Sequence, residues 1–483
     1  MSTERTSGLR QELWALVILA GPLAAAQAGV ALMGITDTAV VGRLGAAPLG
    51  SVGLGNGLFF FFCVLGMGVM LGLDPLISQA IGAGEGPRSR ALIWQSLWLA
   101  LAATLVLTPV IALSPLLLPL FHIDAEMARG AREFTLWRLP GLLPTLLYIG
   151  LRSYLQAVGR TRAIFLTAVL ANLGNLAGDI LLVFGGAHLP PALSWLRGVP
   201  AMGAAGAALS TTLCTLAQAA VLAWVCRSDA MASGLRPSAG EAGFLRAAKE
   251  APSWRPDPRE LRLATIVGVP IGLQLGAEIG VFALAGLLAG GLGRQSVAAH
   301  QLAITLASFT FSCAVGVGNA GGVRVGLAVG AGDTALARRR GLLAIAVGSA
   351  CMALAGLGFF LFPGPLARTF AGSPEIVAAA LPLLMVTAVF QISDGVQGIT
   401  TGVLRGAGDT TFSFLANLVG HYLIGLPLAI VLTYRAHLGV VGLWWGLCVG
   451  LSAVAIGVFA RFLWLSGRPI ATLESSGESA IGS

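Results

Sequence analysis

The sequence predicts an all-α polytopic membrane protein with twelve transmembrane helices in two six-helix lobes related by a parallel internal repeat. Of the 483 residues, 56% are hydrophobic and only 10% are charged, whereas about 25% are charged in an average soluble protein. Uncharged stretches of about 20 residues, the length that crosses a hydrocarbon core of about 30 Å, recur from end to end. The second half of the chain also repeats the first.

Each predicted span is an apolar stretch that ends at charged or loop-forming residues. The first is too long for the apolar core of a signal peptide and no cleavage site follows it, so we expect it to remain as a helix. The twelve predicted spans are 13–41, 49–73, 91–120, 134–157, 163–185, 203–226, 263–291, 296–321, 341–364, 378–404, 411–433 and 439–463.

The basic residues predict the orientation, because loops rich in lysine and arginine stay on the cytoplasmic side. With the N-terminus inside, the predicted cytoplasmic ends and loops hold most of the 29 basic residues. We therefore expect both termini to be cytoplasmic and the protein to lie in the plasma (inner) membrane. The net charge of +8 then follows from topology, and neither a nucleic-acid partner nor an acidic substrate is needed to explain it.

Matching segments follow each other in the same order in both halves. "IGAGEGPRSRA" at 81–91 corresponds to "VGAGDTALARR" at 329–339, and "YLQAVGRTRAIF" at 154–165 to "VLRGAGDTTFSF" at 403–414. Because six helices separate corresponding positions, both copies have one orientation, and such halves typically face a central site. The predicted parts are an amino-terminal lobe at 1–226, a cytoplasmic linker at 227–262, a carboxy-terminal lobe at 263–463 and a cytoplasmic tail at 464–483. An amphipathic helix at 241–250 is a further expectation for the linker.

Four acidic residues are predicted to lie deep within spans: Asp37, Asp179, Glu278 and Asp394. No lysine or arginine is expected at comparable depth. A charge at the bilayer centre costs roughly 2.5 to 3.5 kcal/mol. We therefore expect these acids to face a cavity, to be protonated or to bind cations. The alternative is that each acid only hydrogen-bonds neighbouring helices.

Nearby amides give each acid a polar helix face, because residues three or four apart are neighbours on a helix. The three sets are Asn172, Asn175 and Asp179; Gln274 and Glu278; and Gln391, Asp394 and Gln397. Without a basic partner, such carboxyl groups can carry protons. Carboxylate and amide oxygens are also the hard ligands that an alkali cation prefers.

Other polar or aromatic features are weaker candidates for a functional site. His300 and Gln301 are secondary candidates, although a histidine that only packs or hydrogen-bonds is the alternative. The six cysteines are scattered singly and are expected to be small buried hydrophobic residues, without a disulfide or metal site. The aromatic run at 58–66 either packs or presents rings to a flat ligand. The glycine-rich turns lack a GxxxxGK[ST] motif, so no ATPase subunit is expected.

Several motifs together resemble the multidrug and toxic compound extrusion (MATE) family: "DTAVVGRLG" at 37–45, "QAIGAGE" at 79–85, "AAHQ" at 298–301, "GVLRGAGDT" at 402–410 and "IGLPLAIVL" at 424–432. The resemblance extends over nearly the whole chain. It implies a secondary transporter rather than an enzyme. Such a transporter exports organic cations and other amphiphilic drugs or metabolites in exchange for H+ or Na+, without another cofactor. A monomer in the lipid bilayer that binds small-molecule substrates is expected.

Within that family, the sequence is similar to the NorM branch, whose acids in helices seven and ten correspond to Glu278 and Asp394. The DinF branch lacks this pair. The sequence departs at Asp179, where many bacterial NorM proteins have asparagine, and is similar there to archaeal and some eukaryotic members. The resemblance implies ion coupling or substrate binding at Asp37, Asn175, Asp179, Glu278 and Asp394, with Na+ considered at Asp37, Glu278 and Asp394. The coupling ion and the coupling lobe stay open.

Two other functions fit twelve apolar spans. A flippase for lipid-linked saccharides would have to hold an anionic pyrophosphate, for which arginines within the cavity are the natural ligands, and none is expected at that depth. A channel or a scaffold would not need unpaired acids in both lobes. Dependence of transport on a substrate gradient would separate a channel from an antiporter.

Overall fold

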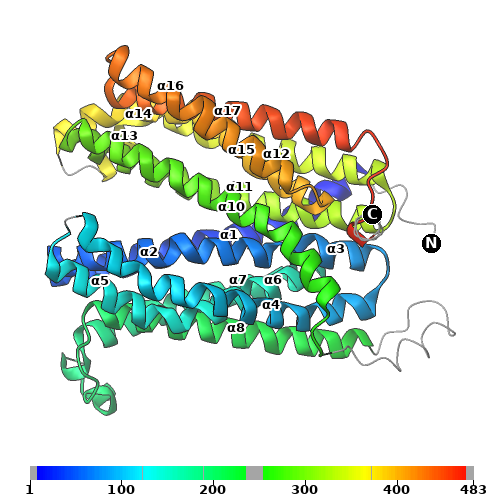
Figure 1. The fold of residues 1–483 in the computed structure, drawn as a ribbon, viewed down its shortest axis with the longest axis horizontal. Coiled ribbons are helices and arrows are strands. Elements are labelled where there is room, and N and C mark those ends of the chain that lie inside the picture. Colours follow the sequence, from blue (N-terminus) through cyan, green and yellow to red (C-terminus); the bar gives the residue numbers. More distant parts are fainter. Residues whose placement is uncertain (1–7, 122, 189, 235–253, 371–372, 475–483) are drawn as a thin grey trace. The chain divides into compact units, whose positions relative to one another are not determined.

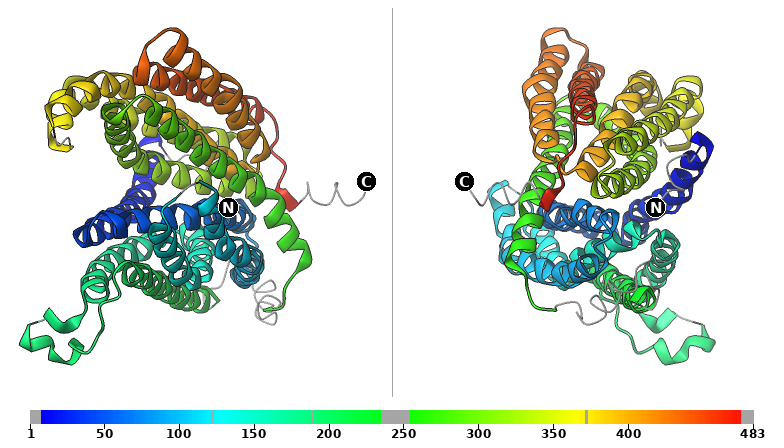
Figure 2. Two further views of the ribbon diagram at one scale, coloured as in Figure 1. Left: turned by 60° about the vertical axis from the view of Figure 1, so that its left-hand side comes forward. Right: turned by 90° about the vertical axis from the view of Figure 1, so that its right-hand side faces the viewer.

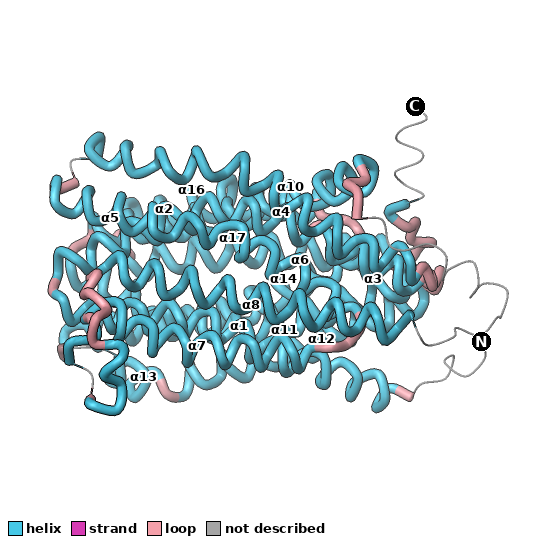
Figure 3. Tube along the Cα trace, turned by 90° about the horizontal axis from the view of Figure 1, so that it is seen from below, coloured by secondary structure: helices cyan, strands magenta, loops and turns pink. Residues whose placement is uncertain are grey.

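The computed structural model describes residues 8–121, 123–188, 190–234, 254–370 and 373–474 (Figure 1). All regular elements among these residues are helices, joined by the short loops drawn in pink in Figure 3. Within these described ranges, twelve helices are long and apolar enough to cross a membrane. The predicted fold class is therefore confirmed, and the chain is a multi-pass membrane protein.

Every predicted span overlaps one observed candidate span, but many observed spans are longer. Their end turns carry polar or charged residues, which hydropathy excludes. The candidate spans are Leu9–Leu44, Ala47–Gly82, Gly86–Leu120, Ala125–Ala157, Thr161–Phe184, Ala204–Ser228, Pro258–Gly291, Arg294–Gly330, Thr334–Leu361, Pro374–Ala407, Thr411–Arg435 and Gly439–Leu465.

Internal contacts divide the chain into two compact units, which we call unit N (29–73 and 86–268) and unit C (1–28, 74–85 and 269–483). This division differs from the predicted lobes, since 1–28 and 74–85 group with unit C. The predicted linker is also helical at both ends, because α8 continues to Gly234 and α10 begins at Pro258. The helix expected at 241–250 lies outside the described residues.

Unit N is a bundle in which α7 packs on α8, α2 on α5, and α6 on both α4 and α8. The short helices η4 and η5 form a loop that projects beyond α7 and α8 in both views of Figure 2. The elements are the end of α1 (Leu9–Val41), η1 (Gly42–Leu44), α2 (Ala46–Leu71), α4 (Gly86–Leu113), η2 (Ser114–Phe121), α5 (Ala125–Arg138), η3 (Leu139–Gly141), α6 (Leu142–Ala157), α7 (Thr161–Phe184), η4 (Gly186–His188), η5 (Pro191–Leu196) and α8 (Ala204–Gly234).

Unit C is built around α14, which packs against α11, α12 and α17. In Figure 2 the orange segment from α15 to η7 lies beside α17 in red. The elements are the start of α1, α3 (Leu73–Gly82), most of α10 (Pro258–Gly291), α11 (Arg294–Gly330), α12 (Thr334–Leu361), α13 (Pro363–Phe370), α14 (Pro374–Ala407), α15 (Thr411–Leu418), the π-helix η6 (Val419–Gly425), α16 (Leu426–Ile430), the π-helix η7 (Val431–Arg435) and α17 (Gly439–Leu465).

Glycines four residues apart bring the backbones of α11 and α14 into contact. A Cβ atom at Gly402 would lie 2.5 Å from the carbonyl oxygen of Gly318, and one at Gly406 would collide with that of Gly322. Small residues at this spacing allow close helix packing in membranes, where apolar burial supplies little attraction between helices. We call these four residues the glycine ladder. Its spacing is visible in the sequence.

The same close packing explains why α3 belongs to unit C. A Cβ atom at Gly326 of α11 would collide with the hydroxyl of Ser78 on α3. One residue further along α3, Gln79 Nε2 donates to the carbonyl oxygen of Gly406 at 3.1 Å. Gln79 Oε1 accepts from the backbone N–H of Leu473 at 2.9 Å. The start of the predicted tail therefore packs against this helix.

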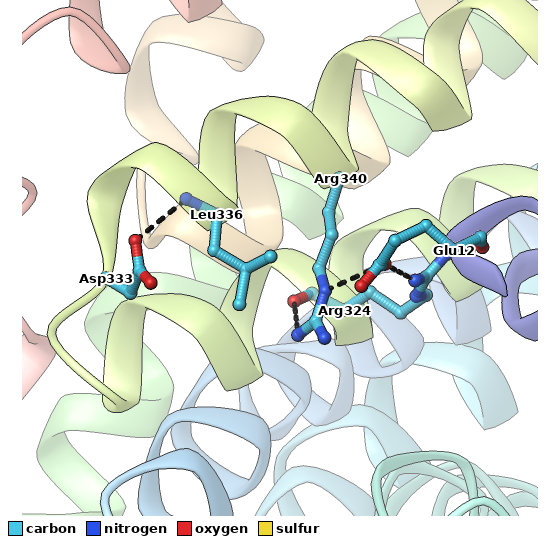
Figure 4. A network of polar contacts seen from close by, with 5 residues as sticks. All are labelled: Glu12, Arg324, Asp333, Leu336 and Arg340. Carbon is cyan, nitrogen blue, oxygen red and sulfur yellow. Dashed lines mark hydrogen bonds and ion pairs between the residues drawn. The ribbon is translucent and has the colours of Figure 1, made fainter. Parts of the chain in front are cut away.

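Within unit C, a buried ion cluster joins the start of α1 to α11 and α12 (Figure 4). Glu12 Oε2 accepts from Arg324 Nη2 of α11 and, at 3.2 Å, from Arg340 Nε of α12. Arg324 Nη1 also donates to the backbone oxygen of Glu12 at 2.7 Å. Only 4% of Glu12 and 6% of Arg324 are exposed. A carboxylate shared by two guanidinium groups compensates for the cost of burying these charges.

The cysteines depart from the expectation that all six are isolated and buried. Cys351 is exposed, whereas Cys63, Cys226 and Cys448 are buried. Cys313 of α11 and Cys351 of α12 also line the same cavity. Because these two residues lie in separate helices, their proximity could not be read from spacing along the chain.

Candidate functional site

A polar cluster in unit N brings together α1, α7 and α8. Asp37, near the end of α1, accepts a hydrogen bond from the Thr211 hydroxyl of α8 at 3.1 Å. On α7, Asn175 Nδ2 donates to Asp179 Oδ1, one turn further on, at 3.3 Å. Asn175 and Asp179 are fully buried. The predicted shared face of α7 therefore points at residues of two other helices.

Asp37 and Asp179 lie close enough to interact through their charges. Asp37 Oδ1 and Asp179 Oδ2 are both buried without a hydrogen-bond partner among the described residues. Two neighbouring carboxylates repel each other, and a proton or a cation between them removes that repulsion. We call this the unit N acid pair.

Small residues make this cluster possible. A Cβ atom at Gly178 would lie 2.5 Å from the Ser210 hydroxyl, so glycine at this position lets α8 approach α7. Ser210 then donates to the backbone oxygen of Asn175 at 3.1 Å. Asn172 lies one turn earlier on α7, and its Nδ2 would be 3.1 Å from a Cβ atom at Gly29 of α1. Its Oδ1 is buried without a partner among the described residues.

One basic residue lies beside this pair, against the expectation that none would be comparably deep. Arg138 lies well inside the candidate span Ala125–Ala157 and interacts electrostatically with Asp37. The expectation was wrong because the predicted span begins at residue 134, close to Arg138. The observed candidate span begins at Ala125, which places Arg138 further from the end of the span.

The second polar cluster lies in unit C and surrounds a partly buried carboxyl group, Glu278 of α10. Glu278 Oε1 accepts three amide hydrogen bonds, from Gln274 at 3.2 Å, Gln397 at 2.8 Å and Asn417 at 2.5 Å. These donors come from α10, α14 and α15. Neutral amides, rather than a basic side chain, therefore position this oxygen.

A second acid lies within electrostatic reach of Glu278. Asp394 of α14 is 8% exposed and interacts with Glu278 through their charges; we call these two residues the unit C acid pair. Asn417 Oδ1 is buried without a hydrogen-bond partner among the described residues. The arrangement brings carboxylate and amide oxygens together, which are the ligands that hard cations prefer.

His421 follows Asn417 by four residues and lies in the π-helix η6. It is 1% exposed, and its ring centroid is 6.3 Å from that of Phe282. π-Helical turns are rare and occur frequently at functional sites. The π-helix η6 therefore begins just after Asn417, the residue that contacts Glu278.

The secondary candidates have other surroundings. Gln391 donates to the Thr310 hydroxyl of α11 at 2.7 Å, and Thr310 lines a cavity of about 270 Å³. His300 accepts from the indole N–H of Trp444 at 3.2 Å within an apolar cluster. Gln301 is exposed. The contacts described for these three side chains are thus not contacts with the acid pairs.

Sequence reasoning did not assign Ser210, Thr211, Arg138 or Asn417 to a site. Serine and threonine are common in membrane helices, so they carry no signal of their own. A helical-face comparison would have identified Asn417. Arg138 could have been identified by its charge inside the predicted span 134–157.

A family model with the description MatE matches residues 22–181 and 270–431. The two matched stretches begin in different halves of the chain, at the offset of about 248 residues that the repeated segments indicate. The family match therefore supports the parallel repeat independently.

Named relatives match almost the full length of the chain. It is 32% identical over 452 residues to "Multidrug resistance protein NorM" of Burkholderia vietnamiensis, with 92% of each chain covered. It is 34% identical over 483 residues to "Probable multidrug resistance protein NorM" of Pseudomonas aeruginosa, with 97% of this chain and 93% of the relative covered.

Solved structures share the fold. "Crystal structure of eukaryotic MATE transporter AtDTX14" has a TM-score of 0.77 at 20% identity, covering 98% of this chain and 99% of that one. "Outward-facing conformation of a multidrug resistance MATE family transporter of the MOP superfamily" has a TM-score of 0.79 at 20% identity, covering 96% and 100%. With the family match and the relatives above, these findings establish that the chain belongs to the MatE family of membrane transporters.

Proposed function

We propose that the protein is a secondary active antiporter that exports organic cations and other amphiphilic drugs or metabolites in exchange for H+ or Na+ by alternating access. The observation that carries this proposal is the presence of one acid pair in each unit, Asp37 with Asp179 and Glu278 with Asp394. Acids within membrane spans are costly unless they bind something. The names of the relatives agree with export of drugs.

Exchange follows from competition for the same negative charge. A proton or a metal cation that enters an acid pair from outside neutralises it and weakens the attraction for a cationic substrate. Release of that ion to the cytoplasm restores the charge, and a new substrate cation can bind. A ligand shifts the equilibrium between two access states only by its difference in affinity for them. The acid pairs supply that difference.

The two pairs support different ions. In unit N, Asp37 and Asp179 interact through their charges. A proton on either carboxyl group removes their repulsion, which favours H+ at this pair. In unit C, three amide donors occupy Glu278 Oε1, while Asp394 and the free Asn417 Oδ1 offer further oxygens. This set suits Na+, because oxygen ligands bind hard cations.

The test is efflux of a fluorescent organic cation from proteoliposomes under separate Na+ and proton gradients. We expect Asp37→Asn to abolish the response to a proton gradient, and Glu278→Gln to abolish the response to a Na+ gradient. Glu126→Gln makes the same change at an exposed position of α5 and is the control. Full transport by Asp37→Asn and Glu278→Gln at every imposed gradient would refute the assigned roles.

A wild-type protein that responds to neither gradient would contradict antiport and favour the flippase alternative. Arg138 is the one observation on that side, because a flippase needs cationic ligands for pyrophosphate. A single arginine beside two aspartates offers little net attraction for such an anion, so export of cations remains the better supported function.

We also propose that the protein works as a monomer in the inner membrane with both termini cytoplasmic. The distribution of basic residues supports this orientation. Labelling of single cysteines introduced near each terminus with a membrane-impermeant maleimide, in intact cells and in inverted vesicles, would test it. Reaction in intact cells would contradict the proposed orientation.

A further inference from the structure

Arg138 is a charged side chain within a candidate membrane span that the proposed exchange of cations does not use. Its guanidinium carbon lies 4.9 Å from the centroid of the Phe59 ring on α2. It interacts electrostatically with Asp37. Its Nη1 atom is buried without a hydrogen-bond partner among the described residues. An arginine keeps its charge in proteins, so it cannot avoid this cost by losing a proton.

The contact with Phe59 leaves hydrogen-bonding capacity unused. A guanidinium group stacks on a ring through its face, while its five N–H groups point outward in the plane. The contact with the Phe59 ring therefore does not satisfy these N–H groups. A buried N–H group without an acceptor is unfavourable, which indicates that an acceptor is supplied by something other than the described residues.

Asp37 does not supply this acceptor. Within the described part of the chain, the structure contains no ion pair or hydrogen bond between Asp37 and Arg138, and Asp37 Oδ1 is itself buried without a partner. Arg138 Nη1 instead lies beside Gly141, where a Cβ atom would be only 2.8 Å from it. An unsatisfied donor and an unsatisfied carboxylate oxygen thus occur in one region of unit N. The arrangement is suited to a ligand that carries both charges.

We propose that Arg138 binds the acidic oxygen group of amphiphilic substrates that also carry an amine, while the unit N acid pair binds the amine. Carboxylates match the guanidinium edge, which can donate two parallel hydrogen bonds to them. Substrates of this class are zwitterions, and Arg138 is the residue that distinguishes them from simple cations. This inference rests on the proposed export function and names a substrate class for its unit N site.

Two dyes on one scaffold provide the test. Rhodamine 110 carries a free carboxyl group, and rhodamine 123 is its methyl ester, so the two differ mainly in the group that Arg138 would bind. We expect Arg138→Gln to raise KM for rhodamine 110 about tenfold to hundredfold, as loss of a charge-assisted contact does. KM for rhodamine 123 should change less than threefold. Arg138→Lys, which keeps the charge but not the planar edge, should have an intermediate effect.

Arg152→Gln is the matched control in these proteoliposome assays. Arg152 of α6 is also partly buried with an unpartnered nitrogen, but its electrostatic partner is Tyr148 rather than an acid. This variant should affect both dyes equally. Equal effects of Arg138→Gln on both dyes, or no effect on either, would overturn the inference.

The wild-type protein gives a result that does not depend on the folding of any variant. Transport of both dyes, with KM for rhodamine 110 no higher than that for rhodamine 123, is the expected outcome. Transport of rhodamine 123 alone would overturn the role of Arg138 and leave the proposed export function standing. Transport of neither dye would contradict the export function and, with it, this inference.

Discussion

Replacing Glu12 by glutamine removes the negative charge that two arginines share at the start of α1. Breaking a buried ion pair by removing one partner costs about 3 to 5 kcal/mol. The structure favours the lower end of this range for two reasons. The Arg340 side chain is 20% exposed and can regain water. The bond from Arg324 to the backbone oxygen of Glu12 does not depend on the side chain. We expect Glu12→Gln to lower the free energy of unfolding by about 3 kcal/mol.

Equilibrium unfolding of the purified protein by SDS in mixed micelles would measure this loss. Glu126→Gln changes an exposed glutamate and should shift stability by no more than about 0.5 kcal/mol. Combining Glu12→Gln with Arg324→Met should cost less than the sum of the single changes, because the double variant removes both charges of the most deeply buried pair, Glu12 and Arg324. A loss for Glu12→Gln no larger than that of the control, or strict additivity, would refute the view that the cluster is buried and coupled.

Three further predictions use the same unfolding assay. Gly402→Val should lower stability by about 1 to 3 kcal/mol, because its Cβ atom would lie 2.5 Å from the Gly318 oxygen. Trp444→Phe should cost about 1 to 2 kcal/mol through loss of the bond to His300, with ring packing largely kept. Gly185→Ala should cost about 1 to 2 kcal/mol, because φ is +78° there. Unchanged stability in any of these variants would contradict the contact, or for Gly185 the backbone strain, from which its prediction is argued.

Hydropathy alone was sufficient for the twelve spans, because each span must be apolar over most of its length whatever it packs against. Hydropathy did not predict which charged residues are buried in ion pairs inside the protein. Glu12 is a helical residue outside the predicted first span, and it is buried only because Arg324 approaches it from 312 positions along the chain. No local pattern carries that information. For the same reason, the grouping of 1–28 and 74–85 with unit C could not be predicted.

The candidate site divides in the same way. The bonds from Asn175 to Asp179 and from Gln274 to Glu278 join residues four apart on one helix, and helical periodicity predicted both shared faces. Partners on other helices were not predictable. Thr211 reaches Asp37 across 174 positions, and a threonine in an apolar span looks the same whether or not it has such a partner.

The glycine ladder limits which point mutations the protein can tolerate. Every single-base change in a glycine codon that alters the amino acid introduces a larger side chain, and at Gly402 and Gly406 the space for a Cβ atom is already occupied by the backbone of α11. No conservative replacement exists at such positions. In a library of random point mutations selected for loss of drug export, inactive alleles should therefore accumulate along this helix contact.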